Sequence, residues 1–220
     1  MQQTSRRTTE VPQESPEQPR RGFSMREAAE TVGLTLLIFL AVHFSIQPYR
    51  VDGPSMQPGL HTNDLLLVNL LTYDFGPPQR GDVVVLHPPS DVTQNYVKRI
   101  VGIPGDTITL TRTTTAVDGT VLNEPYIASE PDGTGENDLG GDLVPCPETG
   151  VMLDAYTCQV VLGANDYWVM GDNRQDSTDS RIFGIVNRSL IIGKAQVVLF
   201  PLSALEWLPN FSQVFAGVGK

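Results

Sequence analysis

Residues 95–106 read N-Y-V-K-R-I-V-G-I-P-G-D, a short β-branched run that ends at a Pro104-Gly105 turn. A run of this length and composition between turn residues predicts a β-strand. Side chains alternate between the two faces of a strand, so Lys98 shares a face with Tyr96 and Ile100, whereas Arg99 points to the other face. The stretch therefore predicts a lysine flanked by large apolar groups on a strand.

The same pattern of short apolar runs, interrupted by Gly, Pro and Asp, continues through the chain after residue 48. Examples are DLLLVNLL, DVVVL, TITLTR, YWVM and GKAQVVLF. Asp118-Gly119, between apolar residues, is a strong hairpin signal. We predict a mostly β fold over residues 48–204, built as two or more antiparallel sheets or an open barrel, with an inserted lobe at about 111–165 that carries the hairpin and a Gly-rich loop. Residues 205–220 are assigned to a C-terminal tail.

An apolar segment precedes the β region. A helix over residues 28–47 would rise roughly 1.5 Å per residue and just cross the ~30 Å of bilayer hydrocarbon. Arg20, Arg21 and Arg26 precede it and only Arg50 follows closely. This bias predicts a single-pass plasma-membrane anchor with a cytoplasmic N-terminus and an extracytoplasmic β domain. A buried core helix and a cleaved signal peptide are the alternatives.

Residues 1–27 form a polar, Pro-rich stretch that is expected to be a disordered cytoplasmic tail. The net charge of −10 and the pI of about 4.6 argue against nucleic acid as a partner. No nucleotide-binding glycine loop is present, and the three histidines lack metal-ligand spacing. We therefore expect no cofactor, metal or nucleotide. In an oxidising compartment Cys146 and Cys158 could form a disulfide, whereas in the cytosol two unrelated thiols are expected, and the sequence leaves the choice open.

A second stretch, V-D-G-P-S-M-Q-P-G-L-H-T at residues 51–62, holds Ser55 in a constrained turn. Gly, Pro and Ser are typical of an ordinary turn, but a turn of this composition could also hold a serine nucleophile rigidly. His43, His61 and His87 have no obvious acidic partner, so a histidine base is disfavoured. A buried lysine is the other base available, because burial disfavours its charged form. Lys98 fits that role unless it is a snorkelling edge-strand lysine.

A third stretch, M-G-D-N-R-Q-D-S-T-D-S-R, joins two apolar segments and places Ser177, Asp179 and Arg181 close together. Because it joins segments of the core, its polar side chains need partners within the domain.

Taken in order, the three stretches resemble the blocks of the membrane-bound type I signal peptidases, a family of serine and lysine peptidases. The resemblance runs from about residue 34 to 200. It departs at Gly53, where many members have a serine that helps to bind the oxyanion, and at Gly59, where Thr or Ala is usual. GDVVVL and VLNEPY also look like segments of the family.

The resemblance implies an endopeptidase that removes signal peptides after small-X-small sites such as Ala-X-Ala. Its partners would be signal-peptide-bearing preproteins and the lipid bilayer. Two other readings are a different serine/lysine hydrolase, such as the self-cleaving repressors, and a catalytically silent relative that binds exported chains. The implied roles are nucleophile for Ser55, general base for Lys98, orientation of the lysine for Ser177, an ion pair for Asp179 and Arg181, and pocket walls for Met56, Leu60 and Tyr96.

Overall fold

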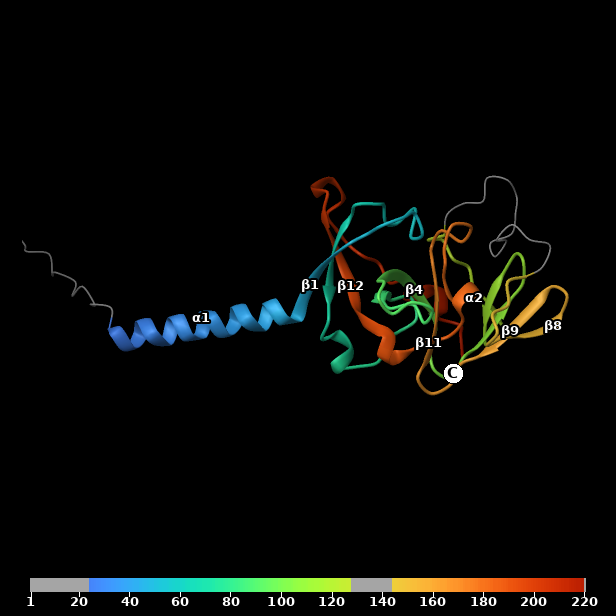
Figure 1. Ribbon diagram of the computed structural model, residues 1–220, viewed down its shortest axis with the longest axis horizontal. Coiled ribbons are helices and arrows are strands. Elements are labelled where there is room, and N and C mark those ends of the chain that lie inside the picture. The colour runs from blue at the N-terminus through green and yellow to red at the C-terminus, as the bar shows by residue number, and fades with distance from the viewer. Residues whose placement is uncertain (1–23, 128–143, 220) are drawn as a thin grey trace, which may run out of the picture. The chain divides into compact units, whose positions relative to one another are not determined.

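The computed structural model describes residues 24–127 and 144–219 (Figure 1). Most of the predicted N-terminal tail and of the Gly-rich loop lies outside these residues. Helix α1 (Met25–Ser45) begins three residues before the predicted anchor and ends two before its end. By length and composition it is the one described helix that could cross a membrane. Thr31 and Thr35 donate their hydroxyls to carbonyls one turn earlier, so these two polar groups are satisfied within the helix.

The β region contains a large antiparallel sheet with strand order β1-β2-β12-β3-β4-β10-β11, to which β13 adds by pairing with β12. Its strands are β1 (Ile46–Arg50), β2 (Leu65–Asn69), β3 (Val83–Leu86), β4 (Tyr96–Gly102), β10 (Asp166–Met170), β11 (Val186–Asn187), β12 (Ile191–Phe200) and β13 (Glu206–Trp207). The strand predicted around Lys98 is β4, and it pairs with β3 and β10. It therefore lies inside the sheet rather than at its edge.

A second antiparallel sheet, with the order β7-β6-β5-β9-β8, forms the inserted lobe (Figure 1). Its strands are β5 (Thr107–Leu110), β6 (Thr115–Val117), β7 (Thr120–Val121), β8 (Val151–Asp154) and β9 (Thr157–Val161). The predicted hairpin joins β6 to β7, with Asp118 at φ 49° and Gly119 at φ 78°. The sheet starts at residue 107 rather than 111, because β5 is its central strand. Cys146 and Cys158 form a disulfide that ties the segment before β8 to β9.

Short helices complete the domain: α2 (Ser180–Phe183) and the 3₁₀ turns Thr72–Asp74, Arg188–Leu190, Leu202–Ala204 and Ser212–Phe215. Residues 205–219, assigned from the sequence to a tail, pack onto the domain instead. Glu206–Trp207 pair with β12, and Phe215 and Val218 are buried in the apolar cluster beneath the second sheet. Burial of these two side chains supplies the stabilisation that orders the segment.

Candidate active site

The turn that carries Ser55 is anchored by the apolar residues around it. Met56 and Leu60 are each 1% exposed and belong to a core cluster with Val51. The Leu60 amide donates to the Met56 carbonyl at 2.9 Å, which closes the turn. Gly53 has φ +89°, a conformation that residues with a Cβ rarely adopt. The turn is therefore held from both sides, and the Ser55 hydroxyl projects from a fixed backbone.

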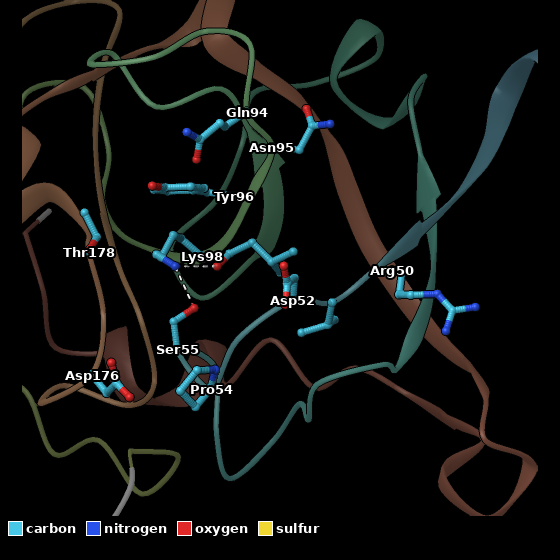
Figure 2. A pocket seen from close by; sticks show the side chains of 12 residues that line it. Arg50, Asp52, Pro54, Ser55, Gln94, Asn95, Tyr96, Lys98, Asp176 and Thr178 are labelled. Carbon is cyan, nitrogen blue, oxygen red and sulfur yellow. Dashed lines mark hydrogen bonds between the residues drawn. The ribbon is translucent and has the colours of Figure 1, made fainter.

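Lys98 reaches Ser55 from the centre of β4, 43 residues further along the chain. Its Nζ donates to Ser55 Oγ at 2.7 Å and to the Val97 carbonyl at 3.0 Å, and it lies 5.2 Å from the centre of the Tyr96 ring. Figure 2 shows the two side chains pointing toward each other, with the Tyr96 ring alongside. The predicted serine and lysine are thus brought together directly.

Burial changes the chemistry of this amine. Only 3% of Lys98 is exposed, and loss of hydration lowers its pKa from the ordinary value of 10.5 to about 8. The carboxylates of Asp179 and Asp172 act in the opposite direction, and Arg181 reinforces the decrease. At pH 7 roughly a tenth of the molecules then carry a neutral Lys98, instead of about one in several thousand for a free lysine.

Residues 170–181, the third stretch of the sequence analysis, form a buried polar turn next to the Ser55 and Lys98 pair. Asp179 and Arg181 make a fully buried ion pair at 2.8 Å, and Gly171 donates its amide to the Asp179 carboxylate at 2.9 Å. Burial alone would raise the pKa of Asp179, but the Arg181 guanidinium and the hydrogen bonds to the carboxylate keep it below its usual value. The predicted ion pair is present, and Asp179 also caps α2 by accepting from the Arg181 amide.

Ser177 lies in this turn, 5% exposed, but no direct hydrogen bond joins it to Lys98 among the described residues. Its hydroxyl oxygen is buried and has no hydrogen-bond partner in the part of the chain that the structure describes. A Cβ on Gly171 would lie 2.2 Å from Ser177 Oγ and 2.4 Å from the Ser55 carbonyl oxygen. Glycine at position 171 is therefore what allows the polar turn to pack directly against the Ser55 backbone.

Ser55 and Lys98 line an open pocket of about 320 Å³. Tyr96 lines it too, and its lining includes the polar residues Arg50, Asp52 and Asp176 (Figure 2). No histidine of the described ranges contributes to its wall.

Met56 and Leu60 line a different cavity, of about 270 Å³, together with Tyr126 and Phe211. Their role as walls of the substrate pocket stays a prediction.

The sequence reasoning missed two buried ion pairs that surround the dyad. Arg99, next to Lys98, bonds Asp172 at 2.6 and 2.8 Å. Arg174 bonds Glu124 of the inserted lobe at 2.6 Å. Partners 50 and 73 positions apart in the sequence leave no periodic pattern. The only local sign of these ion pairs was the density of charged residues in GDNR and NEPY.

A serine hydroxyl bonded to a buried amine of lowered pKa, in an open pocket, is an arrangement suited to a hydrolase that attacks a carbonyl group. Comparison with known proteins narrows this class. Residues 25–200 match the family described as signal peptidase, peptidase S26. The chain belongs to this signal peptidase family and is a peptidase.

Its relatives include a signal peptidase I from Leptolyngbya laminosa, 33% identical over 196 residues, which cover 86% of both chains. Signal peptidase I P from Bacillus subtilis subsp. natto is 36% identical over 174 residues, covering 78% of this chain and 86% of the relative. A solved signal peptidase I from Enterococcus faecalis is 28% identical, covers 53% of this chain and 95% of its own, and superposes with a TM-score of 0.40.

Proposed function

We propose that the protein is an endopeptidase that removes signal peptides from exported preproteins through a Ser55 acyl-enzyme, with Lys98 as the general base. The 2.7 Å hydrogen bond from Lys98 Nζ to Ser55 Oγ carries this proposal, together with the lowered pKa of the buried amine. Family membership supports the reaction, since relatives of similar length are signal peptidases.

The reaction follows from that contact. Neutral Lys98 takes the Ser55 proton as Oγ attacks the carbonyl carbon of the residue before the scissile bond. The Ser55 amide N–H is available to stabilise the oxyanion. Lys98 then gives its proton to the leaving amine, and afterwards activates the water that hydrolyses the ester. Ser177, Asp179 and Arg181 fix the surroundings of the amine.

Position 53 bears on how the oxyanion is held. A serine there would have room for its Cβ, with nothing within 4 Å, but the φ of +89° would strain it. The Gly53 of this chain therefore fits its backbone, and the Ser55 N–H acts without help from a side chain at that position.

The substrate would carry small residues at the first and third positions before the cut, as the resemblance implies. The active site would lie on the outer face of the plasma membrane, because the arginines before α1 favour a cytoplasmic N-terminus. The Cys146–Cys158 disulfide supports an oxidising location for the domain.

Contact of the domain with lipid is a further part of the proposal. Phe200, Leu205 and Trp207 are 54, 56 and 75% exposed and belong to one hairpin around β12 and β13, whereas Leu208 is half-buried. Exposed aromatic groups favour the membrane interface. The fluorescence of Trp207, with Trp168 fully buried as an internal reference, should shift when lipid vesicles are added. An unchanged spectrum would contradict the contact.

The test of function is cleavage of a preprotein with an Ala-X-Ala site by the detergent-solubilised protein. Ser55→Ala and Lys98→Met should abolish cutting, while Lys194→Met, which removes a lysine on β12 outside the pocket, should retain it. The parent rate should rise with pH up to about 8 and then level off. A Lys98→Met variant that still cuts would refute the mechanism, and a parent that cuts no preprotein would favour a silent binding protein.

A further inference from the structure

The inserted lobe reaches the catalytic region through Glu124, which follows β7. Its side chain and that of Arg174 are both fully buried and meet at 2.6 Å. Tyr126 donates its hydroxyl to the same carboxylate oxygen. Arg174 also lies within 3.5 Å of Thr115 Oγ1 on β6. The lobe therefore holds the Arg174 guanidinium by several contacts, in a place without water access.

Arg174 in turn connects the two ends of the polar turn. Its Nε donates to the Gly171 carbonyl at 3.1 Å, and its own carbonyl accepts from Arg181 Nη2 at 2.7 Å. Between these ends, the backbone N–H of Asn173 donates to the backbone carbonyl of Ser55 at 3.1 Å. A displacement of Arg174 would thus be passed to the backbone of the nucleophile.

A second contact from the lobe reaches the residue next to the general base. The Tyr126 ring lies 4.4 Å from the guanidinium of Arg99, which is bonded bidentately to Asp172. Lys98 and Arg99 are consecutive on β4, so Tyr126 and Glu124 support both halves of the dyad from one segment of the lobe.

We propose that Glu124 and Tyr126 are positioning residues, through which the five-stranded lobe fixes the geometry of the Ser55 and Lys98 pair. Loss of the Glu124 charge breaks the buried ion pair at Arg174 Nη2, which is strongly unfavourable, so Arg174 would shift from its place beside Gly171. The turn would move with it. The inference rests on the proposed function, because it concerns the rate of that reaction.

The experiment uses the full chain in detergent and a peptide substrate with an Ala-X-Ala site. Glu124→Gln keeps the shape and removes the charge. We expect kcat to fall at least tenfold while KM stays within about twofold, because misplacement by ~1 Å can cost as much as 100-fold in rate. Arg174→Gln, which removes the bond to the Gly171 carbonyl, should lower kcat as well, and E124Q/R174Q should lose little more than either single variant, because both changes break one connection.

The matched control is Asp106→Asn, which breaks the ion pair of Arg80 with Asp106, also 2.6 Å long, at a place that does not contact the turn. All variants are assayed at a temperature where circular dichroism shows them folded. Asp106→Asn should lower the melting temperature without changing kcat by more than about twofold. If Glu124→Gln behaves like this control, or changes only KM, the positioning role is wrong.

If Glu124→Gln does not fold, Tyr126→Phe provides the test, since it removes only the hydroxyl bonded to Glu124. We expect kcat to fall threefold or more at unchanged KM, and an unchanged kcat would overturn the inference. If the parent protein itself cuts no substrate, it is the proposed function that fails.

Discussion

Lys98 gives a prediction that links catalysis to stability. One pKa unit corresponds to about 1.4 kcal/mol, so a decrease from 10.5 to about 8 costs the folded protein about 3 kcal/mol wherever Lys98 is protonated. Lys98→Met removes this buried charge and retains a long apolar side chain. We therefore expect the inactive variant to be more stable than the parent at pH 7, by up to about 3 kcal/mol.

The sign of the pH dependence is fixed by linkage. Below pH 8 Lys98 is protonated in both the folded and the unfolded parent, so the folded state carries the full cost of burying the charged amine. Between about pH 8 and 10.5 the unfolded chain holds more protons than the folded one, so the parent gains stability as the pH rises. The advantage of Lys98→Met should shrink over that interval and be nearly gone by pH 10.5.

The assay is urea unfolding of both proteins in the same detergent at pH 7 and pH 10.5, followed by circular dichroism. The informative quantity is how the difference in free energy of unfolding between the two proteins changes from pH 7 to pH 10.5. Its value at a single pH also contains the effects of Met on packing and of the lost hydrogen bond to Ser55. Lys194→Met is the control for losing a lysine elsewhere. A difference between Lys98→Met and the parent that stays constant within about 0.5 kcal/mol across this pH range would refute the argument that the amine is held in a desolvated site.

Three further variants test the packing around the site and the disulfide of the inserted lobe. Gly171→Ala places a Cβ 2.4 Å from the Ser55 carbonyl oxygen, so kcat/KM should fall on the order of 100-fold, and unchanged kinetics would contradict the close approach. Gly59→Ala meets nothing closer than 3.7 Å, so activity should persist and the free energy of unfolding should rise by roughly 0.5 kcal/mol; a loss above about 1 kcal/mol in urea titration would show that glycine is required. Replacing Cys146 and Cys158 by serine should lower the free energy of unfolding by about 3 kcal/mol, and an equal denaturation midpoint with an equal m-value would exclude this.

The sequence predicted those features that depend on local patterns. Alternation along β4 placed Lys98 and Arg99 on opposite faces, and the structure directs the two side chains to different partners, Ser55 and Asp172. The Asp118-Gly119 hairpin formed as predicted, because its backbone requirements are met within two residues.

Other features depend on contacts that no local pattern encodes. Glu124 meets Arg174 across 50 residues, and its neighbours in NEPY give no periodic signal. Phe215 and Val218 lie in a short segment rich in small residues, which looks like a tail until the apolar surface that they cover is known. The division of residues between the two cavities depends on the same kind of contact, since Met56 follows Ser55 directly yet lines the other cavity.

The packing of residues 205–219 also fixes an order of events during synthesis. Arg99 donates to the Pro209 carbonyl at 3.1 Å and lies 5.1 Å from the Phe211 ring. A nascent chain contains the other partners of Arg99, Gly81 and Asp172, well before it contains Pro209 and Phe211. The contacts around Arg99, the neighbour of Lys98, can therefore be completed only after Phe211 has been added.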